Sequence, residues 1–204
     1  MRLGIFGGTF DPPHVGHLLA AIDAFEMLNL DRLVFVPAAA QPLKTHVTAA
    51  PPAQRLEMVE LLVADDSRFA VDPIEIEREG LSYTVHTLET YAERYPAAER
   101  FLLVGADVLP TFSAWRDPAR LPELARLVVL RRGAAVAGVG GGAGEPATGS
   151  GDDSAGFGAA TAIETRRVDV SSTEIRARVR AGLSIRGFVV DAVADYIAAT
   201  GLYR

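Results

Sequence analysis

Two histidines three positions apart, His14 and His17, stand in the segment whose residue types best suit chemistry. They belong to residues 7–17, GGTFDPPHVGH, which join a short apolar run to a helical pattern. Glycines let a backbone approach a ligand closely, and the first N–H groups of a helix attract anions. At a helix start the i, i+3 spacing points both imidazoles in roughly the same direction. The segment therefore predicts a phosphate site, where a bound polyphosphate would favour protonation of both rings.

Ordinary structural roles compete with this interpretation at each position. Two glycines after a strand often form only a tight turn, Asp11 suits a capping residue, and a histidine pair near a helix start is commonly structural. A zinc site is a further alternative. The pair lacks the third protein ligand and the adjacent glutamate of the helical zinc motifs, so zinc ranks below phosphate.

A second segment, residues 170–176 with the sequence VSSTEIR, also places polar residues where an extended run gives way to a helix. Ser171 or Ser172 followed by Glu174 resembles a capping box, which is the ordinary interpretation. Arg176 lies one turn into the helix, so hydroxyls, backbone amides and a guanidinium could converge on one phosphate. Two such helix starts on one sheet would suit a triphosphate.

The elements that must position these residues alternate along the chain. Continuous apolar runs predict buried strands at residues 3–6, 33–36, 101–104 and 127–130, with extended segments at 69–76 and 163–170. Apolar residues at helical spacing predict helices at residues 18–30, 53–64, 84–95, 172–181 and 188–199. This order predicts an α/β fold, a doubly wound and mostly parallel sheet with a small helical C-terminal end.

Length and composition limit the remaining possibilities. With 204 residues we expect a single domain over 1–204, in which residues 133–160, holding ten of the 19 glycines, form a flexible insertion loop rather than a lid. The net charge of −6 argues against a nucleic-acid coat, and the absence of cysteine excludes disulfides and thiolate sites. Without an apparent signal peptide or membrane span, we expect a cytoplasmic protein with no membrane partner.

Taken together, the two segments resemble the HxGH-type nucleotidyltransferase superfamily and, within it, the bacterial nicotinate-nucleotide adenylyltransferases. Further matches to that family are Pro37, Pro42, Lys44, Ser82-Tyr83-Thr84, Gly105-Ala106-Asp107, Thr111-Phe112, Trp115, Arg131-Arg132-Gly133 and the terminal Gly201-Leu202-Tyr203-Arg204. The resemblance covers the chain outside residues 133–160. It implies a Rossmann-like nucleotidyltransferase that transfers the adenylyl group of ATP to the 5′-phosphate of nicotinate mononucleotide, giving deamido-NAD and pyrophosphate with Mg²⁺.

The resemblance also implies roles for particular residues. The catalytic set would be His14, His17, Lys44 and Arg176. ATP would be bound by Gly7, Gly8, Thr9, Phe10, His14, His17, Gly105, Asp107, Ser171, Ser172, Thr173 and Arg176. Nicotinate mononucleotide would be bound by Thr9, Lys44, Tyr83, Thr84 and Trp115, with an aromatic face stacked on the pyridine ring. Mg²⁺ would bridge phosphate oxygens with water as its other ligands, so no metal-binding residue is assigned.

The chain departs from the family pattern in two places. Leu43 stands where the family often has a histidine, and His46 follows Lys44 by two residues, which leaves the role of this loop open. The long insertion weakens a ligand role for Arg131 and Arg132. Alternatives are a nicotinamide-mononucleotide or a pantetheine-phosphate adenylyltransferase, or a nucleotide-binding regulator without activity, and a homo-oligomer is left open. A dinucleotide-dependent redox enzyme is disfavoured, because residues 4–10 lack the G-x-G-x-x-G spacing.

Overall fold

The computed structural model of the chain describes residues 1–42, 49–133 and 160–204. Lys44, Leu43 and His46, together with residues 134–159 of the expected insertion loop, lie outside the described residues. The chain divides into two compact units. The first comprises Met1–Gly7, Ala20–Val34 and Tyr83–Arg167, and the second comprises Gly8–Leu19, Phe35–Ser82 and Val168–Arg204.

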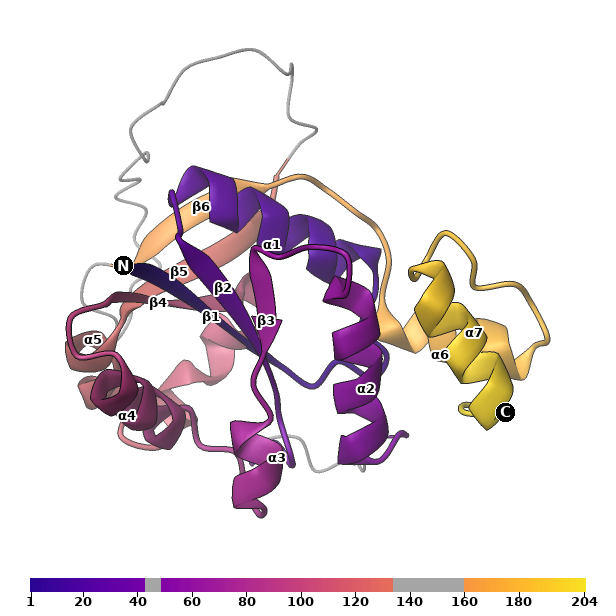
Figure 1. Cartoon of the computed structure of the whole chain (residues 1–204), viewed down its shortest axis with the longest axis horizontal. Coiled ribbons are helices and arrows are strands. Elements are labelled where there is room, and N and C mark those ends of the chain that lie inside the picture. The colour runs from indigo at the N-terminus through magenta and orange to yellow at the C-terminus, as the bar shows by residue number, and fades with distance from the viewer. Residues whose placement is uncertain (43–48, 134–159) are drawn as a thin grey trace, which may run out of the picture. The chain divides into compact units, whose positions relative to one another are not determined.

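Six strands form one parallel sheet in the order β3-β2-β1-β4-β5-β6. Their bounds are Arg2–Gly8 (β1), Arg32–Pro37 (β2), Phe69–Val71 (β3), Glu99–Gly105 (β4), Arg126–Arg132 (β5) and Thr161–Thr165 (β6). In the first unit, β1, β4, β5 and β6 lie side by side, and Arg2–Phe6 pairs in register with Glu99–Leu103 (Figure 1). The middle residues of β1, β4 and β5 are buried, as expected of inner strands of a sheet covered on both faces. The predicted α/β fold with a parallel sheet is therefore confirmed.

Helices of the first unit follow the strands in sequence. They are the part of α1 (Val15–Met27) from Ala20 on, α4 (Thr84–Arg94), α5 (Leu121–Leu124) and the short 3-10 helices η1 (Ala106–Ala114) and η2 (Pro118–Arg120). α4 buries Val85, Leu88 and Tyr91 on one face and contacts α5, which in turn contacts β5. The 3-10 helices were not predicted, and η1 contains Pro110, which breaks the regular helical pattern.

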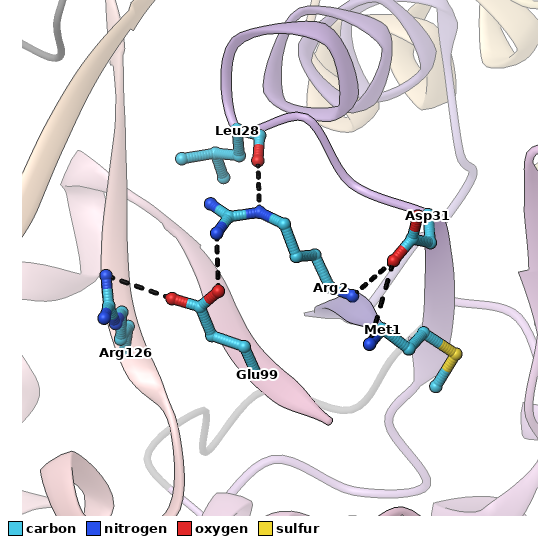
Figure 2. A network of polar contacts seen from close by, with 6 residues as sticks. All are labelled: Met1, Arg2, Leu28, Asp31, Glu99 and Arg126. Carbon is cyan, nitrogen blue, oxygen red and sulfur yellow. Dashed lines mark hydrogen bonds and ion pairs between the residues drawn. The ribbon is translucent and has the colours of Figure 1, made fainter. Parts of the chain in front are cut away.

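Charged side chains tie together the amino ends of the strands of the first unit. Figure 2 shows Arg2 donating through Nε to the carbonyl of Leu28 at 2.9 Å and through its guanidinium to Glu99, which also pairs with Arg126. The backbone N–H of Arg2 donates to Asp31 at 2.6 Å. These contacts lie at the starts of β1, β4 and β5 and next to the start of β2. They are therefore at the ends of the strands opposite to Gly7 and Gly105.

The second unit is built from helices and the short edge strand β3. Its α2 (Pro52–Val63) contacts β3 and α7 (Asp191–Thr200), and α6 (Ser172–Arg180) precedes α7 in the chain. The hydroxyl of Tyr196 on α7 donates to Glu57 on α2 at 2.8 Å. The predicted C-terminal helices are thus confirmed, with boundaries that differ by up to three residues. No helix among the described residues is both long and apolar enough to cross a bilayer.

The expectation for residues 69–76 is partly wrong, because only Phe69–Val71 is a strand and Ile74–Arg78 forms the helix α3. The carboxylate of Asp72 accepts a hydrogen bond from the N–H of Ile74 at 3.0 Å, which starts the helix. Two further boundaries also differ. The helix α1 spans Val15–Met27 rather than residues 18–30, and β6 stops at Thr165 rather than at residue 170. The earlier start of α1 places His17 in its first turn.

Candidate active site

The imidazoles of His14 and His17 lie against each other at the start of α1, within the second unit. Their ring centroids are 3.8 Å apart and their planes differ by 29°, so the rings are stacked as the i, i+3 spacing predicts. The carbonyl of His14 accepts from the N–H of His17 at 2.9 Å, which makes His14 the residue that begins the helix. His14 is 4% exposed, whereas His17 is half-buried.

A hydrogen bond from the backbone fixes the proton position on His17. The N–H of His14 donates to Nδ1 of His17 at 3.2 Å, so this nitrogen acts as an acceptor. The proton of the neutral ring then resides on Nε2, which becomes a donor. A protonated Nδ1 has no lone pair left to accept the N–H of His14, so this hydrogen bond would be lost. Nδ1 of His17 is therefore occupied by the backbone of His14, and Nε2 is the ring nitrogen that can donate to a ligand.

Small and aromatic neighbours hold the two rings in place. A Cβ at Gly16 would lie 3.0 Å from the ring of His14, so a side chain there would push the imidazole aside. Phe10 is buried and packs edge-on against His17, with centroids 5.0 Å apart and planes at 77°. A Cβ at Gly8 would meet the ring of Phe10 at 2.7 Å. The glycines of the motif thus make room for the side chains that support the histidines.

The start of α6 joins this loop in the same unit. Arg176 donates through Nη1 to the carbonyl of Asp11 at 2.7 Å, and the hydroxyl of Ser172 donates to the carbonyl of Pro12 at 2.8 Å. Arg176 also donates through Nη2 to the hydroxyl of Thr173 at 3.3 Å. The two segments singled out in the sequence therefore meet, because the side chains of Arg176 and Ser172 bind the backbone of the loop that leads to His14 and His17.

Some polar groups at these helix starts are already used by the protein. The hydroxyl of Ser171 caps α6 by accepting from the N–H of Glu174 at 3.1 Å, as the capping interpretation predicts. The N–H of Val15 donates to the carbonyl of Phe188 at 3.0 Å and so anchors α1 rather than an anion. A phosphate at this place would therefore depend on side chains more than on the first amide of α1.

The residues expected at the pyridine ring belong to the first unit. Tyr83 directly precedes α4, the guanidinium of Arg116 lies 4.7 Å from the centroid of its ring, and His86 packs edge-on at 5.6 Å. Trp115 is half-buried and lies 5.1 Å from Phe112, centroid to centroid. Trp115 is thus not a core residue, which leaves part of its ring available to a ligand.

The remaining predicted residues of the first unit lie at or just beyond strand ends. Gly7 belongs to the last residues of β1, Gly105 ends β4, and Asp107 is exposed in the following η1. Thr84 is the first residue of α4. Arg131 and Arg132 end β5 with exposed side chains. These positions fit the rule that ligands of parallel sheets bind beyond the carboxyl ends of the strands.

Comparison with known proteins adds to this geometry. Residues 5–178 match the family model described as Cytidylyltransferase-like. A protein of Gemmatimonas aurantiaca named "Probable nicotinate-nucleotide adenylyltransferase" is 54% identical over 209 aligned positions, which cover 100% of this chain and 93% of that protein. The chain belongs to the nicotinate-nucleotide adenylyltransferase family. A family member of the same name from Thermus thermophilus is 44% identical, with 100% of both chains covered.

The fold of this family member also matches a solved structure. Nicotinic acid mononucleotide adenylyltransferase of Plasmodium falciparum, complexed with NaAD, superposes with a TM-score of 0.72 over 99% of this chain and 97% of that chain. Sequence identity is 19%, so this likeness speaks for the Rossmann-like nucleotidyltransferase fold.

Three buried polar residues of this family member were given no catalytic or ligand role from the sequence. Asp11, Arg55 and Tyr203 are 7%, 0% and 7% exposed and lie in the second unit. Burial raises the pKa of the Tyr203 hydroxyl, and its hydrogen bond to Asp11 raises it further. Burial lowers the pKa of the Arg55 guanidinium, which the negative charge of Asp11 opposes. Arg55 shares the buried face of α2 with Met58, Val59 and Leu62. A charged residue at such a position is the sequence signal that could have identified Arg55 as a buried, paired side chain.

Metal binding in this family member would rely on the substrate. Among residues 1–42, 49–133 and 160–204, no group of three or more histidines, aspartates and glutamates could hold a metal ion. The site instead offers donors and cations, which suit the oxygens of a polyphosphate that carries its own Mg²⁺. The residues present therefore fit a metal that arrives with the nucleotide.

Proposed function

We propose that the chain transfers the adenylyl group of ATP to the 5′-phosphate of nicotinate mononucleotide, forming deamido-NAD and pyrophosphate. The observation that carries this proposal is the stacked pair His14 and His17 at the start of α1, in a member of this family whose Arg176 on α6 binds the loop before the pair. These residues offer hydrogen-bond donors and positive charge to phosphate oxygens. These groups suit adenylyl transfer, in which negative charge builds up on the α-phosphate and on the leaving pyrophosphate.

The reaction needs no nucleophile from the protein. An oxygen of the acceptor 5′-phosphate attacks the α-phosphorus of ATP, and the bond to the bridging oxygen breaks as pyrophosphate leaves with the electron pair. The protein's tasks are to align the two nucleotides in line and to stabilise the charge that develops on the transferred group. A Mg²⁺ ion held by the substrate's phosphates would supply further positive charge there.

Within this scheme His17 donates through Nε2 to an α-phosphate oxygen, while its Nδ1 accepts from the backbone of His14. His14 supports His17 by stacking and shares in phosphate binding. Arg176, Ser171 and Thr173 bind the β and γ phosphates through a guanidinium and two hydroxyls. The hydroxyl of Ser171 accepts at the cap of α6 and keeps its own proton for a phosphate oxygen, whereas the hydroxyl of Ser172 donates to the carbonyl of Pro12 and contributes by holding the loop.

Other predicted residues complete the two nucleotide sites in this proposal. Backbone groups of Thr9 and Phe10 line the acceptor phosphate, and Lys44 adds positive charge to it. Asp107 reaches a ribose hydroxyl of ATP from its exposed position after β4, beside Gly105. Gly7 and Gly8 let the phosphates approach the end of β1.

Acceptor choice is assigned to residues around Tyr83. Tyr83 and Trp115 present half-buried aromatic faces that suit a flat pyridine ring, and Thr84 begins a helix whose first N–H groups suit a carboxylate. A pyridine that carries a carboxylate would therefore be preferred over its uncharged amide.

Product analysis tests this proposal. Purified protein with ATP, Mg²⁺ and nicotinate mononucleotide should release pyrophosphate and deamido-NAD in equal amounts, and omission of the acceptor should stop both. Pyrophosphate release without the acceptor would indicate a hydrolase. No release with any acceptor would indicate the regulatory module that the sequence leaves open.

A further inference from the structure

A buried carboxylate, Asp11, collects three hydrogen bonds at the centre of the second unit. Its oxygens accept from the N–H of Ala49 at 2.8 Å, from the N–H of Ala50 at 3.1 Å and from the hydroxyl of Tyr203 at 2.7 Å. Hydrogen bonds to a carboxylate are stronger than those between neutral groups. Asp11 thereby joins the loop before α1, the residues before α2 and the segment after α7.

A buried guanidinium, Arg55, makes a second set of contacts with backbone. Nη1 donates to the carbonyl of Thr9 at 2.7 Å, Nη2 to that of Ala39 at 2.9 Å and Nε to that of Ala50 at 3.2 Å. Arg55 is fully buried, and a buried charge is costly unless it is well paired and hydrogen-bonded. An apolar side chain could fill this space without any hydrogen bond, so the three bonds indicate that Arg55 holds the backbone segments it contacts.

Two bulky residues of this network adopt a backbone conformation that such residues rarely adopt. Phe10 has φ = 51° and Tyr203 has φ = 67°, both in the left-handed region. Such conformations persist only where surrounding contacts hold them, and they concentrate at functional sites. Here Phe10 supports His17, and the hydroxyl of Tyr203 reaches Asp11.

The network connects directly to the proposed catalytic residues. The backbone of Asp11 carries the carbonyl that receives Arg176, while its side chain is held by Tyr203. Thr9, whose carbonyl binds Arg55, lies in the same loop that leads to His14. A shift of this backbone would therefore move the histidines and the guanidinium relative to each other.

We propose that Asp11, Arg55 and Tyr203 are positioning residues, which hold the loop between β1 and α1 in the geometry that adenylyl transfer requires. The part of this proposal that concerns adenylyl transfer rests on the proposed function. The hydrogen bonds that hold the loop are present without substrate and can be tested separately. The hydroxyl of Tyr203 makes the segment that follows α7 a part of that support.

The variant Tyr203→Phe tests the proposal with a minimal change, since it keeps the ring and removes only the hydroxyl. Misplacement of reacting groups by about 1 Å costs roughly 100-fold in rate, and one lost contact of three on Asp11 should cause a smaller shift. We expect kcat to fall roughly 10-fold, with the KM values for both substrates within about threefold of the unchanged protein. Assays well below the melting temperature separate this effect from unfolding.

The matched control is Tyr196→Phe. Tyr196 also donates its hydroxyl to a carboxylate, Glu57, at 2.8 Å in the same unit, but this bond is exposed and joins two residues to which no role in the site is assigned. We expect its kcat to be unchanged. A purely stabilising role for Tyr203 would lower the melting temperature and leave kcat unchanged, which would overturn the proposal.

A second measurement works without turnover. Among the four histidines, the side-chain ¹⁵N–¹H signals of His14 and His17 should shift in Tyr203→Phe, while those of His86 should stay in place. Neither group should shift in Tyr196→Phe. If the unchanged protein had no activity with nicotinate mononucleotide, the proposed function would fail while these shifts still supported the positioning role. Unmoved His14 and His17 signals would overturn that role whatever the activity.

Discussion

The hydrogen bond from the backbone of His14 to Nδ1 of His17 predicts how substitutions at residue 17 should differ. Asparagine places an amide oxygen where Nδ1 lies, so His17→Asn can still accept the N–H of His14, which is 3.2 Å from Nδ1. It has no atom at the place of Nε2. Glutamine is the reverse case, because its amide nitrogen reaches the place of Nε2 but leaves the N–H of His14 without that acceptor.

The expected loss for His17→Asn follows from the role of Nε2. Removing one donor aimed at transition-state charge typically costs about 100-fold to 1,000-fold in kcat, or roughly 3 to 4 kcal/mol. Because the contact matters most as charge develops, the KM for ATP should change by less than about threefold. Loss of the hydrogen bond to His14 in His17→Gln should lower the free energy of unfolding by about 1 kcal/mol.

Steady-state pyrophosphate release and thermal unfolding would measure these effects. We expect His17→Gln to keep a larger part of kcat than His17→Asn, and His17→Ala to lose activity at least as far as His17→Asn. Normal turnover in His17→Asn, or a rise in KM without a change in kcat, would refute the assignment of Nε2 as the donor.

Two further predictions concern stability. Asp23, which is 7% exposed in the first unit, accepts from the backbone N–H of Arg166 at 2.8 Å and from its guanidinium at 2.6 Å. Asp23→Asn should therefore lower the free energy of unfolding by about 1 to 3 kcal/mol, seen in thermal melts, with kcat unchanged; an unaltered melt would contradict this role. In the second unit the pKa of Tyr203 is raised above its ordinary value of 10.0, so the folded protein keeps this proton when the unfolded chain loses it. The free energy of unfolding should thus decrease as pH rises above about 10, less steeply in Tyr203→Phe, and equal slopes in denaturant titrations would count against the buried hydroxyl.

The sequence predicted the parallel sheet because buried strands such as Phe101–Leu103 form continuous apolar runs. It also predicted that His14 and His17 would face the same way, since helical periodicity fixes the relation of residues three apart. The meeting of Arg176 with the loop of Asp11 was inferred from the triphosphate hypothesis, and the structure brings the two together. Local pattern and a chemical hypothesis were sufficient for these features.

Other features depend on contacts between distant residues, which local pattern does not record. Arg55 occupies a buried position of α2 because three carbonyls from other segments surround its guanidinium. Tyr203 reaches Asp11 across 192 positions of the chain. The helix at Ile74 was missed although Asp72 before it is a recognised helix-starting residue.

Several expectations remain predictions. These are the single domain over residues 1–204, the flexible loop at residues 133–160, the cytoplasmic location, the use of Mg²⁺ and the ligand roles of the individual site residues. The role of Lys44 belongs with them, because that residue lies outside the described part of the chain.

A comparison of acceptors tests the central claim most directly. The values of kcat/KM for nicotinate mononucleotide and nicotinamide mononucleotide, measured with saturating ATP and Mg²⁺, compare a carboxylate with an uncharged amide at the same ring position. Sites that recognise a polar group often discriminate by 100-fold or more, because the analogue leaves buried donors unpaired. We predict that nicotinate mononucleotide is preferred by about 100-fold or more. Equal values for the two acceptors, or a preference for the amide, would contradict the account.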